Sequence, residues 1–392
     1  MSEVETLQKT RVSSRVAALK PSGIRKFFEL VMGRPEVISL GVGEPDYSTP
    51  WSIREEAIFS LERGRTSYTS NQGMIEFRQI IARWVEENLH ATYDPKSEIL
   101  VTVGVSEALD LACRAILEPG DEILIPEPCF VSYPALVELA GGKPVMVPTS
   151  GDNDFFPTIR ALEDHTTERT KAILLNSPNN PTGAVIPRVL AEEVAAWVHH
   201  RDLIMISDEI YSPLVYEGEH VSFASLEGMK ERTILLHGLS KGWAMTGWRI
   251  GYSCAPSDIT AAMTKIHQYQ IMCASIMGQS AGIEALKNGR KEVEKMREDY
   301  SRRRRIIAQG FNDIGLPCHV PKGAFYAFPS IQSTGLTSEE FAFRLLEEQD
   351  VALVPGSAFG DSGEGYMRCC YAVSLKTIEE ALRRIEKFVK SL

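Results

Sequence analysis

Short apolar runs alternate with amphipathic segments through the middle of this chain of 392 residues. Residues 99–103 are predicted to form a buried strand, and residues 108–117 a helix, because apolar side chains recur there at helical spacing. The strand pattern returns at 122–125, 171–175, 203–207, 233–236 and 248–253. Strands separated by helices form a mostly parallel sheet with helices on both faces. The sequence therefore predicts an α/β fold with a ligand site beyond the carboxyl ends of the strands.

The pattern changes from about residue 289. A long charged helix, strands near 324–328 and 366–371 and a final amphipathic helix replace the earlier alternation. The length also favours more than one packed core. We therefore expect residues 289–392 to belong to a second, smaller α+β domain.

Composition limits the classes of partner. Hydrophobic residues make up 44% and charged residues 24%, which is typical of a soluble globular protein. The net charge of −10 argues against nucleic acid as a main partner, and no stretch has the length of a membrane span. The polar, acidic N-terminus does not resemble a signal peptide. Seven cysteines without CxxC spacing predict free thiols in a reducing cytoplasm and no metal site. The basic run 302–305 is interpreted as the solvated face of a helix.

Lys241 follows the apolar run 234–236 and so stands at the mouth of the predicted sheet. A lysine held in a pocket can lose its proton and form a Schiff base with a carbonyl compound. Arg249 lies close by in the sequence and is a cation suited to a phosphate. Asp208 directly follows another apolar run, so the sheet can bring it to the same crevice. The combination suggests pyridoxal phosphate as the carbonyl compound.

Ordered blocks extend this interpretation from Ser39 to Tyr371. They are residues 41–46, 68–73, 176–183, 207–211, 240–252 and 321–328, followed by Arg368. In this order they resemble the class I/II pyridoxal-phosphate-dependent aminotransferases of fold type I, in the branch of aspartate, aromatic and broad-specificity enzymes. The resemblance implies a large domain, residues 48–288, that binds pyridoxal 5'-phosphate. It also implies that residues 1–47 complete the small domain formed by 289–392.

The resemblance assigns roles in the chemistry. Lys241 would hold the cofactor aldehyde and, once freed, move the proton at the substrate Cα. Asp208 would face the pyridine nitrogen and keep it protonated. Tyr211 and Asn180 would hydrogen-bond the phenolic oxygen of the ring and stabilise its anion. Phe130 would stack on the ring.

The resemblance also assigns the anion contacts. The junction before a helix starting near Glu107 would cradle the phosphate, because helix N-termini offer free N–H groups. The cradle would consist of Gly104, Val105, Ser106, Ser240 and Arg249. Related enzymes often carry a serine where this chain has Gly238. Arg368, assisted by Gly43 and Asn180, would bind the substrate carboxylate. Tyr68 would reach the phosphate of the neighbouring subunit, so the resemblance implies a homodimer with shared active sites.

The implied activity is transfer of an amino group from an L-amino acid to a 2-oxo acid, expected to be 2-oxoglutarate, by a ping-pong mechanism through the pyridoxal and pyridoxamine forms. Ser106 stands where some aspartate-specific relatives carry a lysine. The segments 21–28 and 267–270 resemble the broad and aromatic branch, and Arg15 or Arg25 is a candidate for extra charge. We expect aromatic and dicarboxylic substrates to be accepted.

Two alternatives remain open. A carbon-sulfur β-lyase would use the same lysine and aspartate but would eliminate a thiol. A pyridoxal-phosphate-sensing regulator would need a DNA-binding domain, and the residues before Ser39 show no helix-turn-helix pattern.

Overall fold

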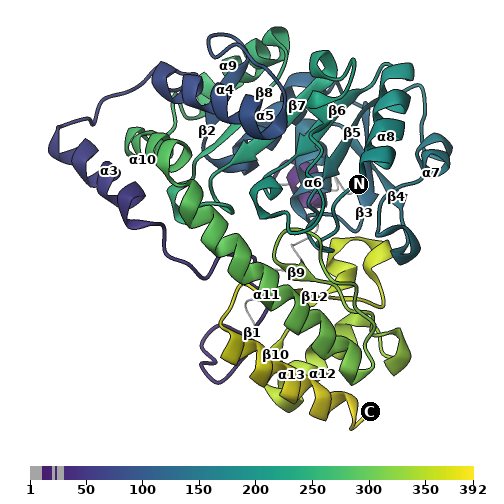
Figure 1. Ribbon diagram of the computed structural model, residues 1–392. Helices are drawn as coiled ribbons and strands as arrows, with labels where there is room; N and C mark the ends of the chain where they lie inside the picture. Colours follow the sequence, from purple (N-terminus) through teal and green to yellow (C-terminus); the bar gives the residue numbers. More distant parts are fainter. Residues whose placement is uncertain (1–10, 20–22, 24–30) are drawn as a thin grey trace, which may run out of the picture.

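A seven-stranded mixed sheet forms the centre of the computed structural model, which describes residues 11–19, 23 and 31–392 (Figure 1). Its strands run in the order β2-β8-β7-β6-β5-β3-β4, and β8 alone is antiparallel to its neighbours. The bounds are β2 Ile99–Thr102, β3 Glu122–Glu127, β4 Lys143–Pro148, β5 Thr170–Asn176, β6 Ile204–Asp208, β7 Thr233–Gly238 and β8 Gly251–Cys254. The mostly parallel sheet is confirmed, and β4 is an edge strand that the sequence analysis missed.

Helices cover both faces of this sheet because side chains alternate along each strand. Leu100 packs toward α5, α6 and α9, whereas the next residue, Val101, packs toward α3, α4 and α10. Farther along the sheet, Ile173 faces α7 and α8. The bounds are α3 Trp51–Glu62, α4 Ile75–Leu89, α5 Gly104–Ile116, α6 Ser132–Ala140, α7 Ile159–Asp164, α8 Arg188–His200, α9 Ser257–Gln270 and α10 Ile276–Asn288.

A second core lies beside the large sheet (Figure 1). It joins α11 (Arg290–Ile314), α12 (Ser338–Gln349) and α13 (Leu375–Val389) to short strands. The strands are β9 Tyr326–Ala327, β10 Val351–Ala352, β11 Val354–Pro355 and β12 Met367–Cys370. Strand β1 (Ile38–Ser39) pairs in parallel with β10, so a segment near the N-terminus joins this part of the chain. This pairing agrees with the predicted composition of the small domain, whose boundaries at residues 47 and 288 remain a prediction.

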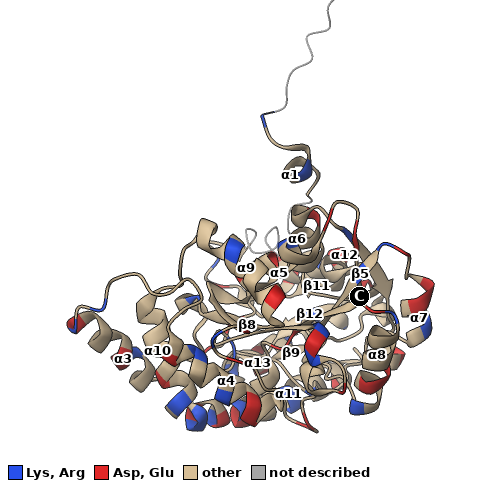
Figure 2. Cartoon of the chain, turned by 90° about the horizontal axis from the view of Figure 1, so that it is seen from above, with Lys and Arg blue, Asp and Glu red and all other residues tan. Residues whose placement is uncertain are grey.

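The short helix α1 (Ser14–Ala18) lies beside α6 (Figure 2). Arg15 donates a hydrogen bond to the carbonyl oxygen of Leu139 at 3.0 Å. The sequence analysis considered Arg15 as a source of charge for the substrate, but the structure places it on the end of α6. Arg25 and, apart from Gly23, the segment 21–28 lie outside the described residues. Among the described helices, none is long and apolar enough to cross a membrane.

The prediction that the basic run 302–305 forms a solvated helix face is wrong for two of its four residues. Arg303 and Arg304 are buried, at 7% and 0% exposure, because they share the inner face of the helix with Tyr300 and Ile307. Arg303 donates to Asp46 at 2.7 Å and to Asp299 at 2.6 Å. These contacts fasten the loop after β1 to α11, so the arginine is structural rather than solvated.

Replacing Arg303 with methionine should lower the free energy of unfolding by about 2–3 kcal/mol, because two partly buried carboxylates lose their cation. The measurement is urea denaturation of the purified protein. The neighbouring Arg302, whose side chain is 72% exposed, provides the control, and Arg302→Met should change stability by less than about 0.5 kcal/mol. Equal effects of the two substitutions would contradict this account of Arg303.

Candidate active site

A cavity of about 510 Å³ opens at the carboxyl ends of β5, β6 and β7. This is the edge at which a largely parallel sheet places ligands. The predicted residues that line it are Gly43, Val105, Ser106, Phe130, Asn180, Asp208, Tyr211, Ser240, Lys241, Arg249 and Arg368. Gly104 lies against Arg249 at the edge of the cavity. Tyr68 does not line it and is 81% exposed.

Lys241 reaches the cavity from the turn that follows β7. Its Nζ donates a hydrogen bond to the carbonyl oxygen of Gly43 at 2.7 Å. Burial lowers the pKa of Lys241 to about 8, since the charged ammonium is poorly solvated there. A substantial fraction of this amine is therefore neutral near physiological pH and able to act as a nucleophile.

Asp208 is the last residue of β6 and is buried, at 6% exposure. Burial raises its pKa to about 6, although hydrogen bonds from the Tyr133 hydroxyl at 2.7 Å and the Ile210 N–H at 3.2 Å act in the opposite direction. Within the described part of the chain, no basic side chain forms an ion pair with it. A buried carboxylate without an ion-pair partner would be stabilised by a cationic nitrogen in the cavity. A protonated pyridine ring has such a nitrogen.

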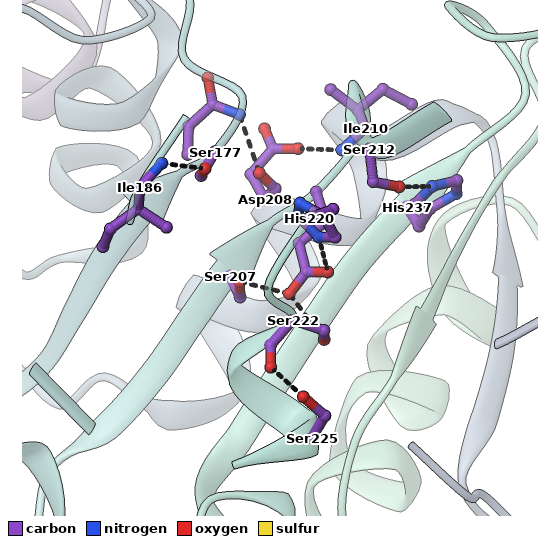
Figure 3. A network of polar contacts seen from close by, with 12 residues as sticks. Ser177, Ile186, Ser207, Asp208, Ile210, Ser212, His220, Ser222, Ser225 and His237 are labelled. Carbon is purple, nitrogen blue, oxygen red and sulfur yellow. Dashed lines mark hydrogen bonds and ion pairs between the residues drawn. The ribbon is translucent and has the colours of Figure 1, made fainter. Parts of the chain in front are cut away.

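The residues behind Asp208 form a hydrogen-bonded network (Figure 3). The buried carboxylate of Glu209 accepts from Ser207 at 2.7 Å and from Ser222 at 2.9 Å, and it contacts His220 Nε2 at 2.7 Å. The backbone next to Asp208 is thereby fixed, which holds the Asp208 side chain in one position.

The residues predicted to bind the phosphate lie at the start of α5. The helix begins at Gly104, not near Glu107 as predicted, and its first N–H groups have no partner within the helix. Gly104 has a φ of +74°, and a Cβ there would come within 2.5 Å of Arg249 Nη2. The Arg249 guanidinium therefore lies against the helix N-terminus, and Ser106 and Ser240 line the same cavity. This set of donors fits a phosphate.

Arg368 lies on β12, at the far side of the cavity, and is 2% exposed. It donates to Asn180 Oδ1 at 3.0 Å and to the carbonyl oxygen of Gly41 at 2.5 Å, while its buried Nε has no partner among the described residues. Its guanidinium is held between the rings of Tyr326 and Phe359, at 4.7 and 4.8 Å. A fixed guanidinium with an unused donor suits a two-pronged contact with a carboxylate.

Two tyrosines that were not predicted line the cavity and contact predicted residues. Tyr133, in the first turn of α6, donates a hydrogen bond to Asp208, and Tyr326 pairs with Tyr211, their hydroxyl oxygens lying 2.8 Å apart. Tyr326 stands in an apolar run, a context that indicates a core residue in the sequence alone. Tyr133 stands three positions after Phe130, a predicted site residue, and this nearness in the sequence was a usable signal.

Comparisons with known proteins agree with this geometry. Residues 35–385 match the family model for aminotransferase class I and II. The chain is 47% identical to the aspartate aminotransferase of Pyrococcus abyssi (strain GE5 / Orsay), over 97% of this chain and 98% of the relative. It is 44% identical to aromatic-amino-acid aminotransferase 2 of Thermococcus litoralis, with the same coverage. The crystal structure of an aromatic aminotransferase from Pyrococcus horikoshii OT3 superposes with a TM-score of 0.90 at 46% identity, covering 94% of this chain and 99% of that one.

The chain belongs to the class I and II aminotransferases and is a pyridoxal-phosphate-dependent transaminase. Within that family it falls in the branch of aspartate and aromatic aminotransferases. The cavity fits the cofactor of the family, because an enclosed lysine, an unpaired buried carboxylate and a phosphate-sized set of donors share it.

Replacing Asp208 with asparagine should stabilise the cofactor-free protein at neutral pH and weaken cofactor binding. Between pH 4 and 6 the folded protein holds a proton on Asp208 that the unfolded chain has lost, so the wild type loses stability as pH rises through this window. Relative to Asp208→Asn, the loss should reach about 3 kcal/mol above pH 6. Urea denaturation at pH 4.5 and 7 measures it. The exposed Asp258→Asn is the control, and a difference that does not change with pH would contradict the expectation.

Proposed function

We propose that this enzyme transfers the amino group of an aromatic or aspartate-like L-amino acid to a 2-oxo acid, with 2-oxoglutarate as the main acceptor, by a ping-pong mechanism. The observation that carries the proposal is the presence of Lys241, Asp208 and Arg368 in one enclosed cavity. The named substrates of the Pyrococcus and Thermococcus relatives support the donor class.

Each of these residues has a proposed role. Pyridoxal phosphate supplies the aldehyde that receives the amino group and a ring that accepts the electrons released at Cα. Arg368 binds the substrate carboxylate and orients the Cα–H bond. Lys241, released from Gly43, takes the proton from Cα as general base. Asp208 would pair with the protonated nitrogen of the cofactor ring and so keep that proton in place. The helix N-terminus at Gly104 and Arg249 hold the phosphate.

The cavity wall supports the aromatic part of the donor class. Val42, Leu109, Phe130 and Leu136 line it, and they offer an apolar surface to a large side chain. Among the described residues, the basic side chains of the lining are Lys241, Arg249 and Arg368, each of which has a proposed role. An aspartate-like substrate would therefore need its second cation from a residue outside this lining.

Single amino acids added to the loaded enzyme, without any 2-oxo acid, should change the cofactor absorption, and phenylalanine and aspartate should react at least about tenfold faster than alanine. Lys241→Ala should lose multiple-turnover transamination by about 10³-fold or more, whereas the exposed Lys287→Ala should not. Retained turnover in Lys241→Ala would refute the assignment of the base. Pyruvate accumulating from cysteine without a 2-oxo acid would favour the β-lyase.

We further propose a homodimer in which Tyr68 completes the phosphate site of the partner subunit. Helix α3 packs on α10 and leaves Trp51, Phe59 and Leu61 exposed, at 57%, 41% and 51%. Large apolar side chains in contact with water on one helix are typical of an interface. Tyr68 lies in the connection from α3 to α4, is 81% exposed, and so is available to a second chain.

Mixing two inactive variants tests whether sites are shared. Lys241→Ala and Tyr68→Ala chains should be nearly inactive alone. If Tyr68 acts across the dimer, each mixed dimer contains one intact site, so random pairing restores about a quarter of wild-type activity. If Tyr68 acts within its own subunit, no mixed dimer has an intact site. A mixture that stays inactive although mixed dimers form would therefore contradict the proposal.

The compartment proposed is the reducing cytoplasm. All seven cysteines are free thiols in the structure, and six of them are buried. Free buried thiols are compatible with a reducing environment.

A further inference from the structure

The hydroxyl groups of Tyr211 and Tyr326 lie 2.8 Å apart at the wall of the cavity, and either could be the donor. Both side chains are buried, at 3% and 1% exposure. In the described part of the chain, neither hydroxyl has another hydrogen-bond partner. Each hydroxyl carries one proton. One proton of the pair makes the mutual bond, and the other is left free, so the direction of the bond decides which tyrosine can donate to a ligand.

The surroundings of the two rings favour one direction. Burial raises the pKa of both hydroxyls. The Arg368 guanidinium acts to lower the pKa of both hydroxyls, but it lies against Tyr326, 4.7 Å from the centroid of that ring, whereas only Tyr211 also has the charge of Asp208 acting to raise its pKa. Between two phenols, the more acidic one is the better donor and the more basic one the better acceptor. These surroundings favour Tyr326 as the donor of the mutual bond.

Packing also holds the Tyr326 hydroxyl in place. A Cβ at residue 43 would overlap this oxygen, so the backbone of Gly43 approaches it closely and closes that side. The ring is fixed by the Arg368 guanidinium and by Phe325, whose ring centroid lies 5.0 Å away. The hydroxyl is thereby left facing Tyr211.

We propose that Tyr326 is a positioning residue, which donates its proton to Tyr211 and so directs the Tyr211 proton into the cavity, toward the phenolic oxygen of bound pyridoxal phosphate. The inference rests on the proposed role of Tyr211 and adds to it a residue that acts through Tyr211. A donor fixed in this direction stabilises negative charge on the phenolic oxygen, because a hydrogen bond to the charged form favours that form.

The test is the pH at which the absorption of the Lys241-linked cofactor changes in the purified holoenzyme. The high-pH form carries more negative charge on the phenolic oxygen, so weaker donation by Tyr211 should raise the transition. Tyr326→Phe keeps the ring against Arg368 and removes only the donor. It should raise the transition by about half a pH unit. In a Tyr211→Phe background, Tyr326→Phe should cause no further rise, since it acts through Tyr211.

Tyr371→Phe is the matched control, because Tyr371 is also a fully buried tyrosine, whose hydroxyl donates to Ala324 at 3.1 Å. It should leave the transition unchanged. An unchanged transition in Tyr326→Phe would overturn the inference, and so would the same shift in both backgrounds. In either case the intact absorption band of the wild type would leave the proposed function standing. A wild-type protein that showed no such band with added pyridoxal phosphate would refute the function itself.

Discussion

Burial of charge without a matching partner is the constraint on which the rest of this structure depends. Lys241 and Asp208 lie in one enclosed cavity, and the burial shifts both pKa values toward the neutral forms. Arg368 is also buried, with one donor unused. A folded chain tolerates such groups only where its surroundings fix them, and the free energy they cost becomes available to a ligand that supplies the missing partners. The cavity would therefore favour ligands that bring a cationic group to Asp208 and an anionic group to Arg368.

The fold brings these groups together because the carboxyl ends of neighbouring parallel strands meet at one edge of the sheet. Asp208 ends β6 and Lys241 follows β7, so the parallel sheet brings them to one edge without any further device. The opposite wall comes from the loop after β1, whose carbonyls at Gly41 and Gly43 accept hydrogen bonds from Arg368 and Lys241. Arg303 in α11 holds that loop through Asp46. The loop after β1 therefore positions both Arg368 and Lys241.

The parts of the fold that the sequence predicted are those with a strong local signal. The apolar strands and the residues that follow them were predicted close to their places, because strand ends in a parallel sheet meet at one edge. The strand predicted at 248–253 is the exception, since β8 begins only at Gly251, after the short helical turn Thr246–Trp248. Edge strand β4 was missed, since Pro144 and Pro148 weaken its strand pattern. The burial of Arg303 depends on partners far away in the chain, Asp46 among them, which no local pattern reveals. Tyr326 was missed for a similar reason, because its function depends on a pairing across 115 positions.

The close approach of Gly43 to the Tyr326 hydroxyl has an evolutionary consequence. Any side chain at position 43 would need the space that this oxygen occupies. A lineage could therefore gain a larger residue at 43 only after position 326 had lost its hydroxyl, and the reverse change would require glycine to return first. The two positions, 283 residues apart (326 − 43), should covary among descendants of this sequence.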